Sequence, residues 1–263
     1  MISTQKMLHL SSRNSCVNGT AKSDLSFNLG DTYRRTAGML YSTVRINSVQ
    51  LPVSFYLIDT QNNAVSIDGQ PYALTLGNYD ALSFTTMFNG LISGVVLSID
   101  LSRLQFSLQG PAHFTFSTNL GAILGFENDA TYLADASGKL EAPYVCNFGG
   151  VQKILITSQI LGTGVYGDVD ANRSVLCSIP LSSDVGNILS WVNVDSGQRS
   201  TISRSSIEGF DIQFRDQNFQ LLNFNGADVY FSLLFESWSN TPPPVSLSIK
   251  ELEALIQKQN APP

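Results

Sequence analysis

The segment DLSFNLG, from Asp24 to Gly30, alternates apolar and polar side chains with a period of two. In an extended chain, Leu25, Phe27 and Leu29 lie on one face and the polar residues between them lie on the other. This pattern is typical of a β-strand with one buried and one solvated face, and it predicts that the chain around it is built from strands.

Similar runs recur along most of the chain. They are rich in Val, Ile, Phe, Tyr and Thr and are separated by Gly, Asn, Asp and Pro, which is the chemistry of strands and turns. The runs are Ser42–Ile58, Gly94–Leu108, Ala112–Thr118, Gln152–Leu161, Ser174–Leu181, Ile188–Val194, Ile207–Asp216 and Asp228–Glu236. Because helices do not alternate with these strands, the pattern predicts an antiparallel sandwich or barrel and not βαβ units.

Three segments have helical patterns: Tyr79–Ser93, a single turn within Asn119–Phe126, and Ser248–Gln259 near the C-terminus. The last begins with a capping box, Ser248 with Glu251, and follows a stiff spacer, Thr241–Pro244. Its apolar stripe consists of Ile249, Leu252, Leu255 and Ile256. A helix this short is marginal alone in water, so we expect it to dock either on its own domain or on a neighbouring subunit.

Composition excludes several classes of protein. The 263 residues carry a net charge of −6, which argues against a nucleic-acid binder with a basic surface. Only 14% of the residues are charged, against about 25% in an ordinary soluble domain, and such a surface suits a chain that packs against others. The apolar runs are too short to span a bilayer, and no signal peptide is expected at the N-terminus.

Three isolated cysteines form neither a disulfide framework nor a CxxC motif, which favours synthesis in a reducing, intracellular compartment.

The segment ILGTGVYGDVDANRSV, Ile160–Val175, fits two binding motifs in part. Its glycines match G-x-G-x-x-G, but a β pattern follows where a dinucleotide loop needs a helix. Its acids resemble the start of a calcium loop, but Arg173 and Ile179 stand where an EF-hand needs Gly and Glu. We therefore expect a turn and no cofactor or metal site.

Catalytic residues are equally poorly supported. His9 and His113 have no ligand or triad partner at a suitable spacing, and we expect His113 in the core or on a strand face. Paired acids for glycoside hydrolysis remain an alternative among Glu127, Asp129, Asp135 and Glu141, although their loop setting favours solvated side chains. A sugar-binding groove is a second alternative, with Trp191, Trp238, Tyr166 and Tyr132 as its aromatic candidates.

Several segments resemble one family of proteins. Four segments show the resemblance. They are INSVQLPVSFYLIDTQNN (Ile46–Asn63), the turn and helix in Leu74–Ile92, the short LGAILGF (Leu120–Phe126) and the closing hairpin Ser206–Glu236. Together they are similar to single jelly-roll penton and minor capsid proteins of double-stranded DNA viruses: nucleocytoplasmic large viruses, virophages and related elements. The likeness spans about residues 20–237.

The resemblance implies one eight-stranded antiparallel jelly-roll sandwich and no enzymatic activity, and it ends before Thr241. Together with the helical patterns of the sequence, it predicts an all-β chain with short helical insertions and a C-terminal helix. A double jelly-roll major capsid protein would need roughly twice this length, since one such domain takes about 200 residues. We expect an N-terminal arm (residues 1–21), the jelly roll (22–240), and the spacer with the amphipathic helix (241–263).

The expected function is that of a structural capsid protein, most specifically the penton at the five-fold vertices of an icosahedral virus. A minor capsid position and a jelly-roll carbohydrate- or receptor-binding module are the alternatives. The expected partners are copies of the chain, with a pentamer favoured, and neighbouring major and minor capsid proteins; direct contact with nucleic acid is not expected. The expected location is the virion, after synthesis and assembly in the host cell. The predicted interaction residues are Ile249, Leu252, Leu255 and Ile256.

Overall fold

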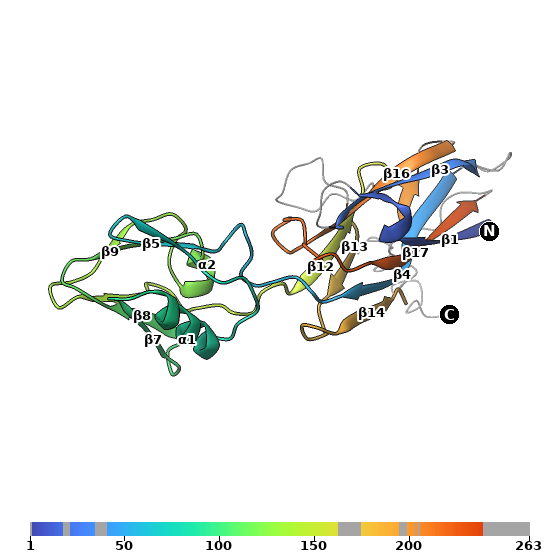
Figure 1. Cartoon of the computed structure of the whole chain (residues 1–263). Coiled ribbons are helices and arrows are strands. Elements are labelled where there is room, and N and C mark those ends of the chain that lie inside the picture. Colours follow the sequence, from blue (N-terminus) through green and yellow to red (C-terminus); the bar gives the residue numbers. More distant parts are fainter. Residues whose placement is uncertain are drawn as a thin grey trace, which may run out of the picture. The chain divides into compact units, whose positions relative to one another are not determined.

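The computed structural model describes residues 2–17, 22–34, 41–162, 175–194, 199–202, 204 and 206–238. Its contacts divide the chain into two compact units (Figure 1). We call Met1–Ser54 together with Lys153–Pro263 the split unit, and Phe55–Gln152 the inserted unit. The inserted unit therefore interrupts the sequence of the split unit once.

Two antiparallel sheets form the split unit. The first, which we call the β4 sheet, has the order β1 (Ile2–Ser11), β17 (Tyr230–Trp238), β4 (Tyr41–Pro52) and β14 (Ile188–Val192), with β15 (Ser200–Ile202) also beside β4. The second, the β16 sheet, has the order β13 (Val175–Pro180), β12 (Lys153–Thr157), β16 (Ser206–Arg215), β3 (Asp24–Arg34) and β2 (Cys16–Val17). A short 3₁₀ turn, η1 (Ser12–Asn14), follows β1.

The strand order is that of a jelly roll. Without the short β2 and β15, the strands follow the chain as β1, β3, β4, β12, β13, β14, β16 and β17. If these are numbered one to eight, the β4 sheet has the order 1-8-3-6 and the β16 sheet has the order 5-4-7-2. Two interleaved antiparallel sheets in this order make the double Greek key of a jelly roll. The predicted all-β jelly-roll class is confirmed.

Aromatic side chains join the two sheets. Phe231 of β17 lies edge-on to Phe27 of β3 and to Phe214 of β16, with ring centres 5.6 and 5.8 Å apart. Tyr33 of β3 packs on Phe235 of β17 at 4.6 Å. Since neighbouring strand positions alternate between faces, odd-numbered β17 positions point into the sandwich and even-numbered ones point away. Ser232, Glu236 and Trp238 therefore lie on the outer face of the β4 sheet.

The inserted unit has two smaller sheets and two helices. One sheet has the order β10 (Tyr132–Leu133), β9 (Thr115–Thr118), β5 (Ala64–Ile67) and β6 (Gln70–Ala73). The other has the order β11 (Lys139–Glu141), β8 (Gln105–Gln109) and β7 (Val96–Asp100). The helices are α1 (Ala81–Leu91) and α2 (Gly121–Leu124).

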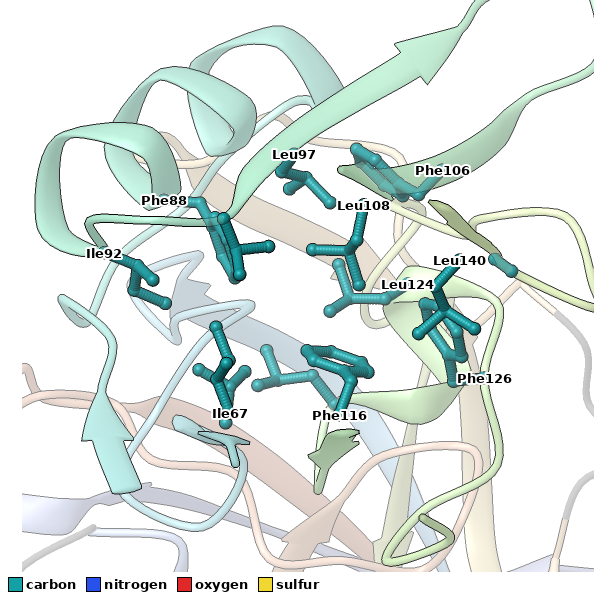
Figure 2. Packing of buried hydrophobic residues seen from close by; sticks show 14 of the residues in the cluster. Ile67, Phe88, Ile92, Leu97, Phe106, Leu108, Phe116, Leu124, Phe126 and Leu140 are labelled. Carbon is teal, nitrogen blue, oxygen red and sulfur yellow. The ribbon is translucent and has the colours of Figure 1, made fainter. Parts of the chain in front are cut away.

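A hydrophobic core of its own holds the inserted unit together. Figure 2 shows Phe88 of α1 and Leu97 of β7 pointing toward Ile67 of β5 and Phe116 of β9, so the core lies between the two sheets. The helix α1 begins where Asp80 accepts a hydrogen bond from the backbone N–H of Ser83 and the Ser83 hydroxyl accepts one from Asp80. This reciprocal cap satisfies amide groups at the helix start.

The local predictions agree with most elements. The helix predicted within Tyr79–Ser93 and the turn within Asn119–Phe126 are confirmed by α1 and α2. The run Gly94–Leu108 is not one strand but the hairpin of β7 and β8. The predicted C-terminal helix lies outside the described residues.

The structure differs from two of the predicted domain boundaries. Residues assigned to an N-terminal arm include β1, which pairs with β17 from Ile2 to Ser11. The range expected to be one jelly-roll domain contains the inserted unit as a second compact body, and not only short helical insertions. Both units are built from short amphipathic strands, so no change of composition marks the border between them.

Candidate functional site

The outer face of the β4 sheet carries a polar depression. Cross-strand pairing aligns His9 with Ser232 and Ser232 with Ser48, and in the next row it aligns Tyr230 with Gln50. These side chains share the face opposite to Phe231, whose ring lies in the sandwich. Three strands that are distant in sequence thus bring them together.

Small residues hollow the surface at this point. Ser48 and Ser232 share a hydrogen bond of 2.6 Å between their hydroxyl oxygens, and Ser232 is 1% exposed. Larger side chains surround this pair. The resulting open depression has a volume of about 330 Å³ and is lined by His9, Leu10, Ser11, Asn14, Ser48, Gln50, Tyr230 and Phe231. The lining therefore combines the short hydroxyl side chains of Ser11 and Ser48 with longer polar side chains and with the apolar Leu10 and Phe231.

The walls retain their hydrogen-bonding capacity. Within the described part of the chain, the side chains of His9, Asn14, Gln50 and Tyr230 form no hydrogen bond with another residue. All four are exposed to solvent. Their amide, imidazole and hydroxyl groups offer both hydrogen-bond donors and hydrogen-bond acceptors to a ligand in the depression.

Farther along the same face, a buried ion pair crosses the strands. Arg199 Nε donates to Glu236 Oε2 at 2.8 Å, and Gln5 Nε2 donates to the other carboxylate oxygen at 3.0 Å. Glu236 is 1% exposed, and the Arg199 guanidinium carbon lies 5.5 Å from the centre of the Trp238 ring. Both oxygens of the buried carboxylate are thus satisfied, so this cluster is part of the framework.

Trp238 belongs to that framework as well. It is buried, stacks on Tyr41 with 6.0 Å between ring centres, and donates its indole N–H to Thr43 Oγ1 at 3.2 Å. It therefore does not line a groove, contrary to the sugar-binding alternative that named it.

A second charged cluster fastens the N-terminal region to the turn before β17. Asp228 accepts hydrogen bonds from Arg13, from Lys22 Nζ at 2.8 Å and from Ser12 Oγ at 3.2 Å. The hydrogen bonds from Lys22 and Arg13 lower the pKa of Asp228 to about 2. The carboxylate is thus held ionised by residues that precede β3.

The edge strand β14 exposes apolar side chains. Ile188 and Val192 are 68% and 61% exposed, and Val194, just after the strand, is 95% exposed, while Leu189 points into the sandwich and is 3% exposed. The strand ILSWV contains no charged residue and pairs with β4 on one side. Within the described residues, no strand pairs with its other edge. Such an edge is open to another chain.

Most candidates from the sequence stay apart in the structure. His113 sits with φ +60° in an exposed turn before β9, not in the core or on a strand face. The four acids are exposed, as expected of solvated side chains, but Glu141 ends the strand β11 and does not lie in a loop. Asp135 caps a turn, Glu141 pairs with Lys139, and Glu127 and Asp129 lie nearer to α2. Over the described ranges, no three His, Cys, Asp or Glu residues lie close enough to hold a metal ion.

The remaining aromatic candidates also lie separately. Tyr132 packs edge-on to Phe126 in the inserted unit, and its hydroxyl accepts from the Glu127 amide, while Trp191 lies on β14. Tyr166 and most of Ile160–Val175 fall outside the described residues, as do the four interaction residues of the C-terminal stripe.

The cysteines show no reactive site in the part described. Cys177 is buried in β13, and burial raises the pKa of its thiol to about 12. Burial also raises the pKa of Cys146.

The polar depression itself was missed from the sequence. Its wall residues stand at positions 9, 14, 50 and 230. Only the register of β1, β17 and β4 places His9, Gln50 and Tyr230 in adjacent rows, and Asn14 joins them from η1. The alternation of these strands signals which residues share a face, but not which strands are neighbours.

Comparisons with known proteins found likeness among solved structures. No family model and no curated protein matches the chain. The solved structure of the mavirus penton protein is similar with a TM-score of 0.46 and 13% sequence identity, over 89% of this chain and 100% of that one. In the described residues, none of the helices is both long and apolar enough to cross a membrane.

Proposed function

We propose that this chain is a structural subunit of a viral capsid, and specifically the penton protein that forms pentamers at the five-fold vertices of an icosahedral shell. The proposal is supported by the single jelly roll and by the sequence segments that resemble penton and minor capsid proteins. The observation that carries it is the exposed apolar edge β14 on a chain that is poor in charge.

An edge of this kind is suited to contact with a second copy. Proteins that stay monomeric usually protect their edge strands with Lys, Pro or bulges, and β14 has none of the first two. A contact between this edge and a different surface of the next copy is heterologous, and such contacts close into rings when the rotation allows. Five-fold symmetry is one such closed ring.

The C-terminal segment is the second proposed contact. The stripe Ile249, Leu252, Leu255 and Ile256 acts as a latch on a neighbouring subunit. Residues 239–248 lie between β17 and this stripe, and ten extended residues reach at most about 35 Å. The latch requires that this reach spans the distance to an adjacent copy.

The proposed setting follows from this role. Neighbouring major and minor capsid proteins are the further partners, the virion is the location, and assembly takes place in the host cell. With a net charge of −6, the chain is not proposed to bind nucleic acid directly. Its mechanism is assembly and not catalysis.

Oligomer mass in solution tests the proposal, measured by native mass spectrometry and sedimentation velocity on the full chain. We expect a pentamer for the unaltered chain. The double variant Ile188→Lys with Val192→Lys places charges on the β14 edge and is expected to shift the chain to monomers. Leu133→Lys, at a residue 62% exposed in the inserted unit, is the matched control and should leave the pentamer intact.

The possible results test the pentamer, the β14 contact and the C-terminal latch separately. A monomeric unaltered chain contradicts the penton, and a trimer supports a minor capsid position in its place. A pentamer that survives both lysines contradicts the role of β14. Deletion of residues 248–263 should leave the fold intact and weaken assembly, so an unchanged oligomer mass and particle yield would rule out the latch.

A further inference from the structure

The depression on the outer face of the β4 sheet has the construction of a ligand site. Ser48 lines it and is held by a hydrogen bond to the buried Ser232, while His9, Gln50 and Tyr230 line it from three strands. The volume of about 330 Å³ lies at the lower end of small-molecule pockets. It is large enough for one sugar ring and too small for a folded partner.

The site is built on rigid elements. The two rows that form it belong to β1, β17 and β4, whose pairing extends over the whole length of β17. Asn14 enters from η1, directly after β1, and the Asp228 cluster holds that region in place. Side chains positioned by paired strands need little ordering when a ligand arrives.

The polar groups of the site are unpaired and mixed in kind. Asn14 and Gln50 each carry an amide with both a donor and an acceptor, and they form no side-chain hydrogen bond within the described residues. An amide can therefore bind neighbouring hydroxyl groups, accepting from one and donating to another. Such pairs of hydroxyls are the characteristic feature of a sugar ring.

Tyr230 supplies the apolar surface that a sugar also needs. Its side chain is 43% exposed in the middle of the site, between the strands that carry His9 and Gln50. An aromatic ring presents an apolar body with a polar tip, and the C–H face of a pyranose can pack on that body. The site thus offers one apolar platform with hydrogen-bonding groups on both sides.

Charge selects among the candidate ligands. Among the described residues that line the depression, none is Asp, Glu, Lys or Arg. Arg13 does not line the depression, and its Nε is paired with Asp228. Phosphates, sulfates and acidic sugars need such a cation, whereas a neutral ring with hydroxyl groups does not.

From this geometry we propose that the depression binds a neutral hexose unit of a glycan, with Tyr230 as the stacking platform and Gln50, Asn14 and His9 as hydrogen-bonding groups. This is a binding activity separate from assembly, and its test does not depend on the oligomer. For one sugar ring in an open site we expect a Kd on the order of 1 mM.

Saturation-transfer NMR on the full chain provides the test. The probes are methyl glycosides of glucose, galactose, mannose and N-acetylglucosamine, with sialic acid as the anionic comparison and adenosine as a planar ring that could also stack. We expect saturation of the ring protons of at least one neutral glycoside and of neither comparison compound. The variant Tyr230→Ala should weaken that binding at least tenfold.

Two further variants keep the result interpretable. Gln50→Leu retains the size of the side chain and removes its hydrogen bonds, so it should also weaken binding. Tyr56→Ala changes a tyrosine of equal exposure, 43%, in the inserted unit and should leave binding unchanged. Circular dichroism and an unchanged unfolding midpoint verify that each variant is folded.

Several results overturn the proposal. It fails if no neutral glycoside binds at a glycoside concentration 10-fold above the expected Kd. It also fails if the Tyr230→Ala and Tyr56→Ala variants bind the glycoside equally well. It also fails if adenosine or sialic acid binds in place of the neutral sugars, since those results point to a nucleotide or an anion site.

Discussion

Phe231 packs between the two sheets of the split unit, so its substitution tests how much this packing stabilises the jelly roll. Its ring is 4% exposed and lies edge-on to Phe27 and Phe214, one from each of two strands in the opposite sheet. Replacement by alanine removes the ring and leaves a cavity between the sheets. Such Phe→Ala changes cost about 3–5 kcal/mol.

The magnitude follows from the contacts. Each edge-to-face pair adds about 0.5–1.5 kcal/mol beyond the buried area, and Phe231 forms two of them. We therefore expect Phe231→Ala to lower the free energy of unfolding by about 4 kcal/mol. With a urea m-value of about 2 kcal/mol/M, the midpoint falls by about 2 M. Phe231→Leu keeps most of the volume and should cost about 1–1.5 kcal/mol.

Tryptophan fluorescence provides a selective assay. The chain has two tryptophans, Trp191 and Trp238, and both belong to the split unit. The urea transition that they report is therefore that of the jelly roll. Phe106→Ala is the matched control, because Phe106 is also fully buried but lies in the core of the inserted unit. We expect it to leave the fluorescence midpoint within about 0.5 M of the unaltered chain.

Two results would refute this reasoning. If Phe231→Leu were as costly as Phe231→Ala, a cavity between the sheets would not explain the loss. If Phe106→Ala lowered the fluorescence midpoint as much as Phe231→Ala, the two cores would not be energetically separate.

Three further predictions concern polar and backbone features. Glu236→Gln leaves its partly buried guanidinium partner without a counter-charge and should cost about 3 kcal/mol in urea unfolding, whereas Glu141→Gln breaks an exposed pair and should leave the urea midpoint nearly unchanged; equal losses would contradict the importance of burial. Because the pKa of Asp228 is lowered to about 2, its contribution is fully present above the unfolded pKa of about 3.9 and is lost as the pH falls toward 2. Asp228→Asn should therefore flatten the dependence of the urea midpoint on pH between 4 and 2, and an unchanged slope would show that other groups cause it. Gly138→Ala adds a Cβ 2.0 Å from the carbonyl oxygen of Gly110 at a φ of +76°, so it should lower the thermal midpoint of the inserted unit, and an unchanged midpoint by circular dichroism would contradict this.

The class of fold could be predicted because it depends on local alternation. The pattern in Asp24–Gly30 becomes β3, where Leu25 and Phe27 are buried and Ser26 and Asn28 are not. The start of α1 could be predicted approximately for the same reason, since its amphipathic pattern and cap are contained in one short segment. Local chemistry is sufficient for such elements.

Features that depend on distant pairing could not be predicted. The polar segment before Ser11 gives weak strand signals, and it becomes β1 because β17 provides its hydrogen-bonding partner. The sequence carries no signal at the border of the inserted unit, because the strands of both units have the same kinds of residues. The candidate sugar site is of this kind too, since His9, Gln50 and Tyr230 meet only through the register of three strands.

The pairing of β1 with β17 also determines the order in which the chain can fold during synthesis. The hydrogen bond between Gln5 and Glu236 joins residues 231 positions apart, so the jelly roll cannot close until nearly the whole described chain has left the ribosome. The inserted unit is continuous from Phe55 to Gln152 and has its own core, so it can fold while later strands are still being made. At about 5–20 residues per second, the β1 segment waits roughly 10–50 seconds without its partner strand. Nascent copies on one messenger are therefore most open to pairing with each other through β1 during that interval.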